Sequence, residues 1–388
     1  MKVLVTDAHY NHTLAAVRGL GKEGVDITAC SENKFSISFY SKYCNHKLIY
    51  PSPLKTPERF IEFLLKKVKQ NKYDVIIPIG LHTTRLLSFN KDKFTKFTEL
   101  PIVDYEIFMK AYNKYETLKI ASKIGVKCPK TIIPKDINEV KRISEDINYP
   151  VVLKTDKEGG KIAYANSSEE LISKYSISNL KFHGLNEKYR YMIQEYIPGN
   201  IFGFFALFNN SKPRAIFIHK RIREYPITGG PSTLRESIKN ADVKKAGLKI
   251  LKALKWHGVA MVEFKLDSRD KKPKLMEVNP KFWGSLALSI ASGINFPYML
   301  CKMATEKDVE TKFDYKSNIR CRWFLGDILY VLSYLRSSRP NKLKVLKEFM
   351  KLREKNMFYD DLSSDDPLPA LAEFTTLPLS KVLSHLMR

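Results

Sequence analysis

Strand and helix patterns alternate along the first 110 residues. Apolar runs at 2–6, 25–30 and 74–80 predict buried strands, and apolar positions three to four residues apart over 12–20 predict a helix between the first two. Strands that alternate with helices indicate a parallel sheet, because parallel strands need a crossover connection. We therefore expect an α/β domain at residues 1–110.

The next region, residues 111–305, mixes its elements differently. Strand-like runs at 150–154 and 192–197 are followed by two more, at 204–208 and 215–219, that a short polar turn joins. Runs of strands with few helices between them indicate antiparallel sheets. We expect an α+β layout here, so the whole chain combines an α/β with an α+β region.

The tail, residues 306–388, contains one strongly patterned segment. Over 342–355, Leu343, Leu346 and Met350 recur at helical spacing among several lysines, which predicts a basic amphipathic helix. Such a helix either docks on the protein's own core or attaches to an anionic lipid surface or a partner. The sequence leaves these alternatives open, and we expect the tail to be a mainly helical extension.

A carboxylate and a carboxamide share one face of a predicted strand at 274–281. Side chains alternate across a strand, so Glu277 and Asn279 point the same way. A second strand-like run at 262–266 carries Glu263, and turn-forming residues between the two runs predict a hairpin. Carboxylate and amide oxygens are hard ligands that suit Mg²⁺, with Mn²⁺ as the alternative. The pattern therefore predicts a metal site for nucleotide chemistry.

Composition limits the class of protein and its partners. The chain has 388 residues, 44% of them hydrophobic, which is enough for two or three domains. Its net charge of +25 suits anionic substrates, an anionic membrane surface or nucleic acid, or else a surface of solvated lysines. No aromatic RNA-binding motif is interleaved with the basic residues, so we expect no nucleic-acid partner. No apolar stretch reaches the ~20 residues of a membrane span, which leaves peripheral contact as the only membrane alternative.

The five cysteines are scattered and have no Cys-x-x-Cys spacing. This usage indicates a reduced, cytoplasmic protein without a zinc or disulfide framework. No signal peptide is apparent in the first residues. The motifs of P-loop nucleotidases and of α/β-hydrolase esterases do not occur, so both classes lose support.

Several segments together resemble the ATP-grasp superfamily. The matching segments are 113–131, Pro150-Val151-Val152-Leu153-Lys154, Gln194-Glu195-Tyr196-Ile197-Pro198-Gly199 and Met276-Glu277-Val278-Asn279-Pro280. They resemble, in order, the entry segment, the nucleotide-binding lysine strand, the adenine hinge and the metal strand of that superfamily. The segments 225–233 and 256–264 look like the carboxylate–amine ligase branch, which is close to carbamoyl-phosphate synthase.

The resemblance also implies a domain organisation. Residues 1–110 would be a Rossmann-like domain that precedes the grasp. Residues 111–305 would form the two-lobed ATP-grasp domain, with a small ATP-binding lobe at 111–195 and a metal-binding, catalytic lobe at 196–305. The helical extension at 306–388 would follow.

Nucleotide-binding roles follow from the resemblance. Backbone groups of Glu195 and Ile197 would bind adenine, while Tyr196 faces the other way. Lys114 and Lys154 would contact polar atoms and phosphates of the nucleotide as compact cations.

The phosphates would lie between a glycine loop and the hairpin. Gly159 and Gly160 would let backbone N–H groups approach phosphate oxygens. Glu263, Glu277 and Asn279 would hold Mg²⁺ on the β- and γ-phosphates, where it neutralises charge during phosphoryl transfer.

Three basic residues complete the implied site. Lys281 projects from the same strand face as Asn279 and would hold the carboxylate or the transferred phosphoryl group. Arg221 and Arg223 have planar guanidinium groups that suit a carboxylate or an acyl phosphate. The acid that often binds ribose after the hinge has no counterpart here, and the alternatives are that Asn200 substitutes for it or that ribose recognition is looser.

The resemblance implies an ATP-dependent ligase that activates a carboxylate as an acyl phosphate and joins it to an amine. Its partners would be small-molecule carboxylates and amines, and the oligomeric state stays open, with a homo-oligomer among the alternatives. One rival function is phosphorylation of bicarbonate or carbamate, as in carbamoyl-phosphate synthase. The other is a non-catalytic nucleotide-binding protein that its basic tail recruits.

Overall fold

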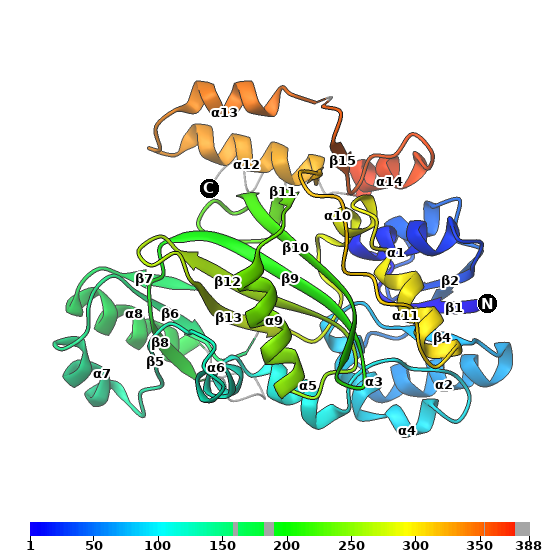
Figure 1. Cartoon of the computed structure of the whole chain (residues 1–388), viewed down its shortest axis with the longest axis horizontal. Coiled ribbons are helices and arrows are strands. Elements are labelled where there is room, and N and C mark those ends of the chain that lie inside the picture. Colours follow the sequence, from blue (N-terminus) through cyan, green and yellow to red (C-terminus); the bar gives the residue numbers. More distant parts are fainter. Residues whose placement is uncertain (158–161, 182–189, 353, 377–388) are drawn as a thin grey trace.

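The computed structural model describes residues 1–157, 162–181, 190–352 and 354–376 of the chain. In these residues the strands form three sheets, of four, four and seven strands. Figure 1 shows the seven-stranded sheet in the centre, with the N-terminal unit and the small four-stranded lobe on opposite sides of it. The central position of this sheet makes it the surface on which the other parts meet.

The N-terminal unit is the parallel sheet that the alternating pattern predicted. Its strands lie in the order β3-β2-β1-β4, and every pairing in it is parallel. Val3 and Val5 enter one buried cluster and Leu4 enters another, so both faces of β1 are covered. The elements are β1 (Lys2–Val5), α1 (Asn11–Gly21), β2 (Asp26–Ser31), the 3₁₀ helix η1 (Ile37–Tyr40), β3 (His46–Ile49), α2 (Pro57–Asn71), β4 (Val75–Ile77), α3 (Leu81–Phe89), α4 (Lys91–Phe94) and α5 (Tyr105–Tyr112).

The small lobe is an antiparallel sheet with strand order β5-β8-β6-β7. The helix that enters this lobe is capped by Asn113, whose side chain accepts hydrogen bonds from the backbone N–H groups of Tyr115 and Glu116. The elements are α6 (Lys114–Lys123), β5 (Thr131–Ile132), α7 (Ile137–Ser144), β6 (Val151–Thr155), β7 (Ala163–Ala165), α8 (Ser168–Lys181) and β8 (Tyr191–Glu195). The cap fixes the start of α6, and with it the position of Lys114.

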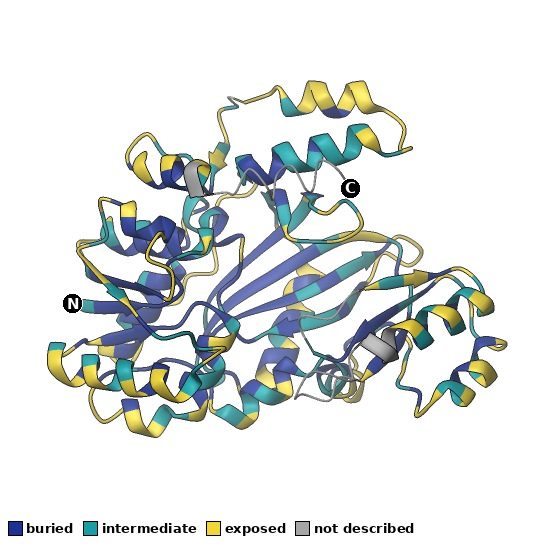
Figure 2. Ribbon diagram, turned by 180° about the vertical axis from the view of Figure 1, so that it is seen from behind, coloured by how far each residue is buried: buried dark blue, intermediate teal, exposed yellow. Residues whose placement is uncertain are grey.

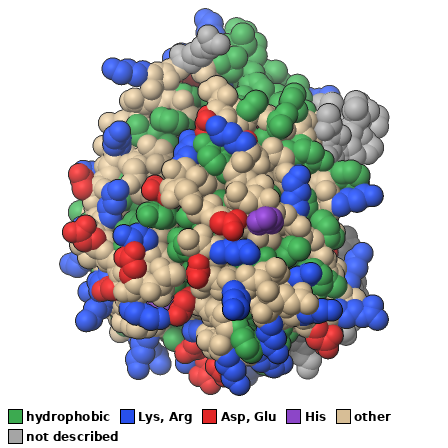
Figure 3. Space-filling view, turned by 90° about the vertical axis from the view of Figure 1, so that its right-hand side faces the viewer, with side chains coloured by type: hydrophobic (Ala, Val, Ile, Leu, Met, Phe, Trp, Pro, Cys, Tyr) green, Lys and Arg blue, Asp and Glu red, His purple; other side chains and the backbone are tan. Residues whose placement is uncertain are grey.

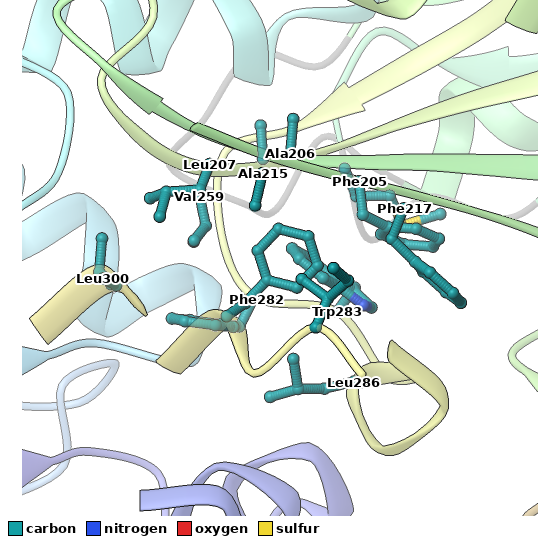
Figure 4. Close-up of a cluster of buried hydrophobic side chains, with 14 of the residues drawn as sticks. Phe205, Ala206, Leu207, Ala215, Phe217, Val259, Phe282, Trp283, Leu286 and Leu300 are labelled. Carbon is teal, nitrogen blue, oxygen red and sulfur yellow. The ribbon is translucent and has the colours of Figure 1, made fainter. Parts of the chain in front are cut away.

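The central sheet has the strand order β13-β12-β9-β10-β11-β14-β15. One face packs on α9, where Gly247 lets the helix approach the ring of Phe204. On the other face Trp283 packs on Phe205 with ring centroids 4.5 Å apart, in the apolar cluster of Figure 4. The elements are β9 (Gly199–Asn209), β10 (Lys212–Glu224), β11 (Ser232–Ser237), α9 (Ala241–Ala253), β12 (Gly258–Asp267), β13 (Pro273–Asn279) and α10 (Leu286–Ala291).

The chain after residue 305 is not purely helical. Two short strands in it, β14 and β15, join the edge of the central sheet. The remaining elements are α11 (Phe296–Thr305), β14 (Arg320–Arg322), α12 (Phe324–Arg336), α13 (Lys342–Phe349), β15 (Met357–Tyr359) and α14 (Leu368–Thr376). Figure 2 shows buried residues concentrated in the central sheet, while α13 is mostly exposed. The predicted basic helix is shorter than expected, because it ends at Phe349.

Candidate active site

The predicted hairpin is present, and it brings the two acids together. In the register of β12 and β13, Glu263 lies directly opposite Glu277, and Met261 lies opposite Asn279. Directly opposite residues share a face of the sheet, and their Cβ atoms are about 4.5–5.5 Å apart. The amide of Asn279 donates a hydrogen bond to Glu277 Oε1 at 2.9 Å. Two carboxylates and one carboxamide therefore form one cluster.

Basic side chains from three separate elements surround this acid pair. Lys114, at the start of α6, places its Nζ 2.9 Å from Glu277 Oε2. Arg221 on β10 donates a hydrogen bond to Glu263. Lys154 on β6 is buried, with 7% of its surface exposed, and its charge acts on both acids. The small lobe thus contributes two cations to the site, and the central sheet contributes the two acids and Arg221.

Burial and charge act on this cluster in opposite directions. Burial raises the pKa of Glu263, and Arg221 counteracts only part of that effect. Burial also acts on Glu277, but Lys114 and Asn279 outweigh it and lower the pKa of this carboxyl group. Burial, with the neighbouring charge of Lys114, lowers the pKa of Lys154 to about 8. Such perturbed groups in one cluster are typical of a functional site.

The predicted adenine hinge follows β8 and connects the two lobes. Glu195 accepts a hydrogen bond from Arg269 at 2.6 Å, and its backbone N–H donates to the carbonyl of Lys130. The carbonyl of Ile197 accepts a hydrogen bond from Lys265 Nζ at 2.9 Å, and the same ammonium lies 4.8 Å from the centroid of the Tyr196 ring. The hinge is therefore fastened to the central sheet through β12 and the turn after it.

A pocket of about 670 Å³ opens beside the hinge, between the small lobe and the central sheet. Tyr164 and Tyr196 contribute aromatic surface to it, with ring centroids 6.0 Å apart. Lys265 and Arg221 line the pocket from the sheet. Because Arg221 also pairs with Glu263, the pocket and the acid cluster are adjacent. The size suits a nucleotide-sized ligand.

The other predicted site residues lie in different surroundings. Lys281 follows β13 and lies close enough to His12 for its charge, after burial, to help lower the pKa of that imidazole to about 3. Arg223 is turned away from the acid pair, because a bulge in β10 separates it from Arg221. Its guanidinium donates to Asp327 on α12 at 2.7 Å. The predicted glycine loop, Gly159 and Gly160, lies outside the described residues.

The donor atoms of the hairpin fit a hard divalent cation. Within the described residues, no group of three or more His, Cys, Asp and Glu side chains could hold a metal ion. The cluster instead offers two carboxylates and one amide oxygen, which is enough for Mg²⁺ because this ion keeps several waters and shares phosphate oxygens. In this structure Lys114 and Arg221 neutralise the two acids, so a bound cation would share the carboxylates with them.

Sequence reasoning missed one residue of this site, Lys265, and one buried ion pair beside Arg221. Lys265 lies two positions after Glu263 on β12, so period-two alternation already placed it on the same face of the strand. Arg235 lies directly opposite Arg221, and its guanidinium donates a hydrogen bond to Asp360 from the C-terminal part of the chain. No local signal in the sequence indicates this second arrangement, because it depends on strand register and on a distant segment.

Known proteins resemble this chain in sequence. Residues 188–326 match a family model described as "ATP-grasp in the biosynthetic pathway with Ter operon". A D-aspartate ligase from Enterococcus faecium is 22% identical, over 83% of this chain and 81% of its own length. The carbamoyl phosphate synthase large chain of Pyrococcus furiosus is 23% identical over 74% of this chain, which spans only 28% of that protein.

Solved structures resemble the fold. The biotin carboxylase domain of Hydrogenobacter thermophilus 2-oxoglutarate carboxylase, solved with MgADP and bicarbonate, superposes with a TM-score of 0.66. It is 17% identical, over 82% of this chain and 73% of that one. The chain has the ATP-grasp fold. The resemblance to that superfamily, carried by the hinge and hairpin segments, is thereby confirmed.

None of the helices in the described part of the chain has the length and apolarity needed to cross a bilayer.

Proposed function

We propose that this protein is an ATP-dependent ligase that joins a small-molecule carboxylate to an amine through an acyl phosphate. One observation carries the proposal: Glu263 and Glu277 are paired across a hairpin and enclosed by Lys114, Arg221 and Lys154 beside a nucleotide-sized pocket. The similarity to a D-aspartate ligase, over 83% of this chain and 81% of that protein, supports the same reaction class.

ATP would lie in the pocket between the lobes. The adenine would bind backbone groups of Glu195 and Ile197, and Lys265 would border it together with Tyr196. The phosphates would extend toward the acid cluster, where Lys114 and Lys154 supply positive charge.

Glu263, Glu277 and Asn279 would hold Mg²⁺, for which Mn²⁺ is the alternative. When bound, this ion would neutralise charge on the β- and γ-phosphates. The same carboxylates also orient the surrounding cations, since each acid is paired with a basic side chain.

The substrate carboxylate would bind against Arg221, and Lys281, two residues beyond Asn279, would approach it from the end of β13. A carboxylate oxygen attacks the γ-phosphorus, the bond to the ADP oxygen breaks, and an acyl phosphate and ADP result. The amine then attacks the acyl carbon, inorganic phosphate leaves, and the nitrogen loses a proton to give the amide. Holding two anions side by side accounts for much of the acceleration. We leave Arg223 out of this set, because its guanidinium is engaged with Asp327.

We also infer the organisation that accompanies this function. The parallel unit at 1–110 is the Rossmann-like domain that precedes the grasp, 111–195 is the ATP-binding lobe and 196–305 the catalytic lobe. The segment 306–388 is an extension, and its described part packs on this lobe through β14 and β15. We place the protein in the cytoplasm, with a homo-oligomer among its assembly states.

A screen of carboxylate and amine pairs with Mg-ATP tests this function. We expect phosphate release that depends on both substrates, with the amide identified by mass spectrometry. Glu277→Gln should lower kcat/KM by about a hundredfold or more, because it removes a charge that the metal and Lys114 share. Glu58→Gln, on the distant helix α2, serves as the control. Undiminished turnover of Glu277→Gln, or no ADP with any pair, would reject the proposal.

A second candidate is phosphorylation of bicarbonate or carbamate. The similarity to a carbamoyl phosphate synthase large chain over 74% of this chain favours it. Bicarbonate-dependent ADP formation without any other carboxylate would support this reaction over the ligase. Amide formation in bicarbonate-free buffer would exclude it as the main activity.

A further inference from the structure

Helix α13 presents two different faces. Val345 is buried, and Phe349 stacks on Phe324 of α12 with ring centroids 6.2 Å apart. The only acid of this helix, Glu348, lies 3.5 Å from Arg223, although 45% of its side chain stays exposed. One face of α13 therefore packs on the protein, which explains the apolar residues Val345 and Phe349 of this helix.

The other face of α13 carries large apolar side chains that remain in solvent. Leu343 is 76% exposed, Met350 64% and Leu346 40%. Their spacing of three and four residues puts them on one side of the helix, where they form a continuous stripe. An exposed apolar stripe of this kind indicates an interaction surface.

Basic side chains flank this apolar stripe. They are Lys342, Lys344, Lys347 and Lys351. Within residues 1–157, 162–181, 190–352 and 354–376, none of these four lysines has an acidic partner within 4.0 Å. Four lysines stand against the single acid Glu348, which is paired with Arg223, so this segment carries a net positive charge.

The excess of positive charge continues beyond the helix. A pocket of about 440 Å³ meets the end of α13 at Glu348 and Lys351, and its lining contains six basic side chains against three acidic ones. In Figure 1, α13 lies at the periphery of the molecule, beyond α12. Figure 3 shows Lys and Arg spread over one face of the molecule, with apolar side chains gathered at its top. Leu343 and Met350, at 76% and 64% exposure, are therefore open to a flat anionic surface.

We propose that α13 is a docking surface for an anionic lipid membrane. A convex helix with apolar residues along its ridge and lysines on both flanks can bury the ridge at the headgroup boundary while the lysines meet lipid phosphates. A groove would favour a partner helix, but the stripe forms a ridge. The proposal is independent of the ligase activity, because the stripe contains no residue of the active site.

Sedimentation with vesicles tests the proposal on the full-length protein. We expect binding to vesicles rich in phosphatidylglycerol, little binding to phosphatidylcholine alone, and release at high salt. Leu343→Ser/Met350→Ser and Lys344→Glu/Lys347→Glu should each weaken binding about tenfold or more. Because all four side chains are exposed, thermal unfolding and nucleotide binding should be unchanged.

Matched controls separate the stripe from general effects. Leu54→Ser/Phe89→Ser removes two equally exposed apolar groups from the N-terminal unit, and Lys66→Glu/Lys110→Glu reverses two exposed charges there. Both controls should keep more vesicle binding than the α13 variants. Equal losses in control and α13 variants would overturn the proposal. So would absence of binding, or a dimer in analytical ultracentrifugation that Leu343→Ser/Met350→Ser dissociates.

Discussion

Lys154 shows how one residue's environment can tie nucleotide binding to pH. The side chain is buried on β6 and faces Lys114, so both its desolvation and a like charge disfavour the ammonium form. Its pKa is lowered to about 8, from an ordinary 10.5. Lys154 is therefore mostly charged at pH 7 and mostly neutral at pH 9, although a lysine normally keeps its charge at both values.

This environment predicts a pH-dependent nucleotide affinity. As pH rises from 7 to 9, the charged fraction of Lys154 falls to about one tenth, so ADP binding should weaken by up to about tenfold. Isothermal titration in buffers of different ionisation enthalpy should also detect proton uptake near pH 8. Lys154→Arg, whose guanidinium stays protonated, should give a flatter profile. A wild-type affinity that is constant across this range would contradict the prediction.

Residue-level chemistry was predictable where it depends on local period. Glu263, Glu277 and Asn279 were found because alternation along two strands and a turn between them fix which side chains share a face. For Arg221 and Arg223, by contrast, the strand period predicts the same face, so sequence reasoning assigned both arginines the same role. Residues two positions apart on a strand should share a face, but the bulge between Arg221 and Arg223 shifts the register and directs Arg223 to Asp327. The local sequence contains no signal that predicts this β-bulge.

At the scale of elements, α9 is held against the central sheet by a glycine in mid-helix. A Cβ atom on Gly247 would lie 2.3 Å from the ring of Phe204 on β9. Glycine normally weakens a helix by about 1 kcal/mol relative to alanine. Its presence here is explained by close packing of α9 on β9. Strand β9 lies inside the central sheet and pairs with β12, the strand that carries Glu263.

We expect Gly247→Ala to destabilise the protein despite the gain in helix propensity. Forcing the methyl group against Phe204 should lower the free energy of unfolding by about 1–3 kcal/mol. Urea denaturation followed by circular dichroism measures the change. Lys245→Ala, on the exposed side of the same helix, should stay within about 0.5 kcal/mol. Adding Phe204→Leu should recover part of the loss, and a neutral or stabilising Gly247→Ala would refute the packing argument.

Element prediction succeeded where a segment is strongly apolar or long enough to show a period. The short strands β1 and β4 lie in continuous apolar runs, and the hairpin strands β9, β10, β12 and β13 are 11, 13, 10 and 7 residues long. By contrast, β14 and β15 have three residues each, and their strand character comes from pairing with β11 and with each other. Tertiary pairing, which a local pattern cannot show, therefore adds two short strands to the mainly helical tail and joins it to the central sheet.

At the scale of the whole molecule, the C-terminal segment connects the first domain to the catalytic sheet. Asp366 accepts a hydrogen bond from Arg18 of α1 at 2.9 Å and further ones from Ser41 and the backbone of Lys42. A few residues earlier, Asp360 is paired with Arg235 on β11. One short segment thus fixes the N-terminal unit relative to the strands that carry the site. No pattern within 306–388 indicated these partners. Arg18 and Ser41 are each more than 300 residues away from Asp366 in the sequence, and a local pattern does not reach that far.

Removing this connection should destabilise the molecule far more than removing a surface ion pair. In Asp366→Ala, the guanidinium of Arg18 would lose its carboxylate while staying largely buried, at 12% side-chain exposure. Loss of one partner of a buried pair typically costs about 3–5 kcal/mol. The control, Glu306→Ala, breaks the exposed pair with Lys302 and should cost about 0.5 kcal/mol or less. Chemical denaturation of both variants measures the difference. Equal, small losses would show that the N-terminal unit is held by its apolar contacts alone, and that the long-range ion pair adds no stability.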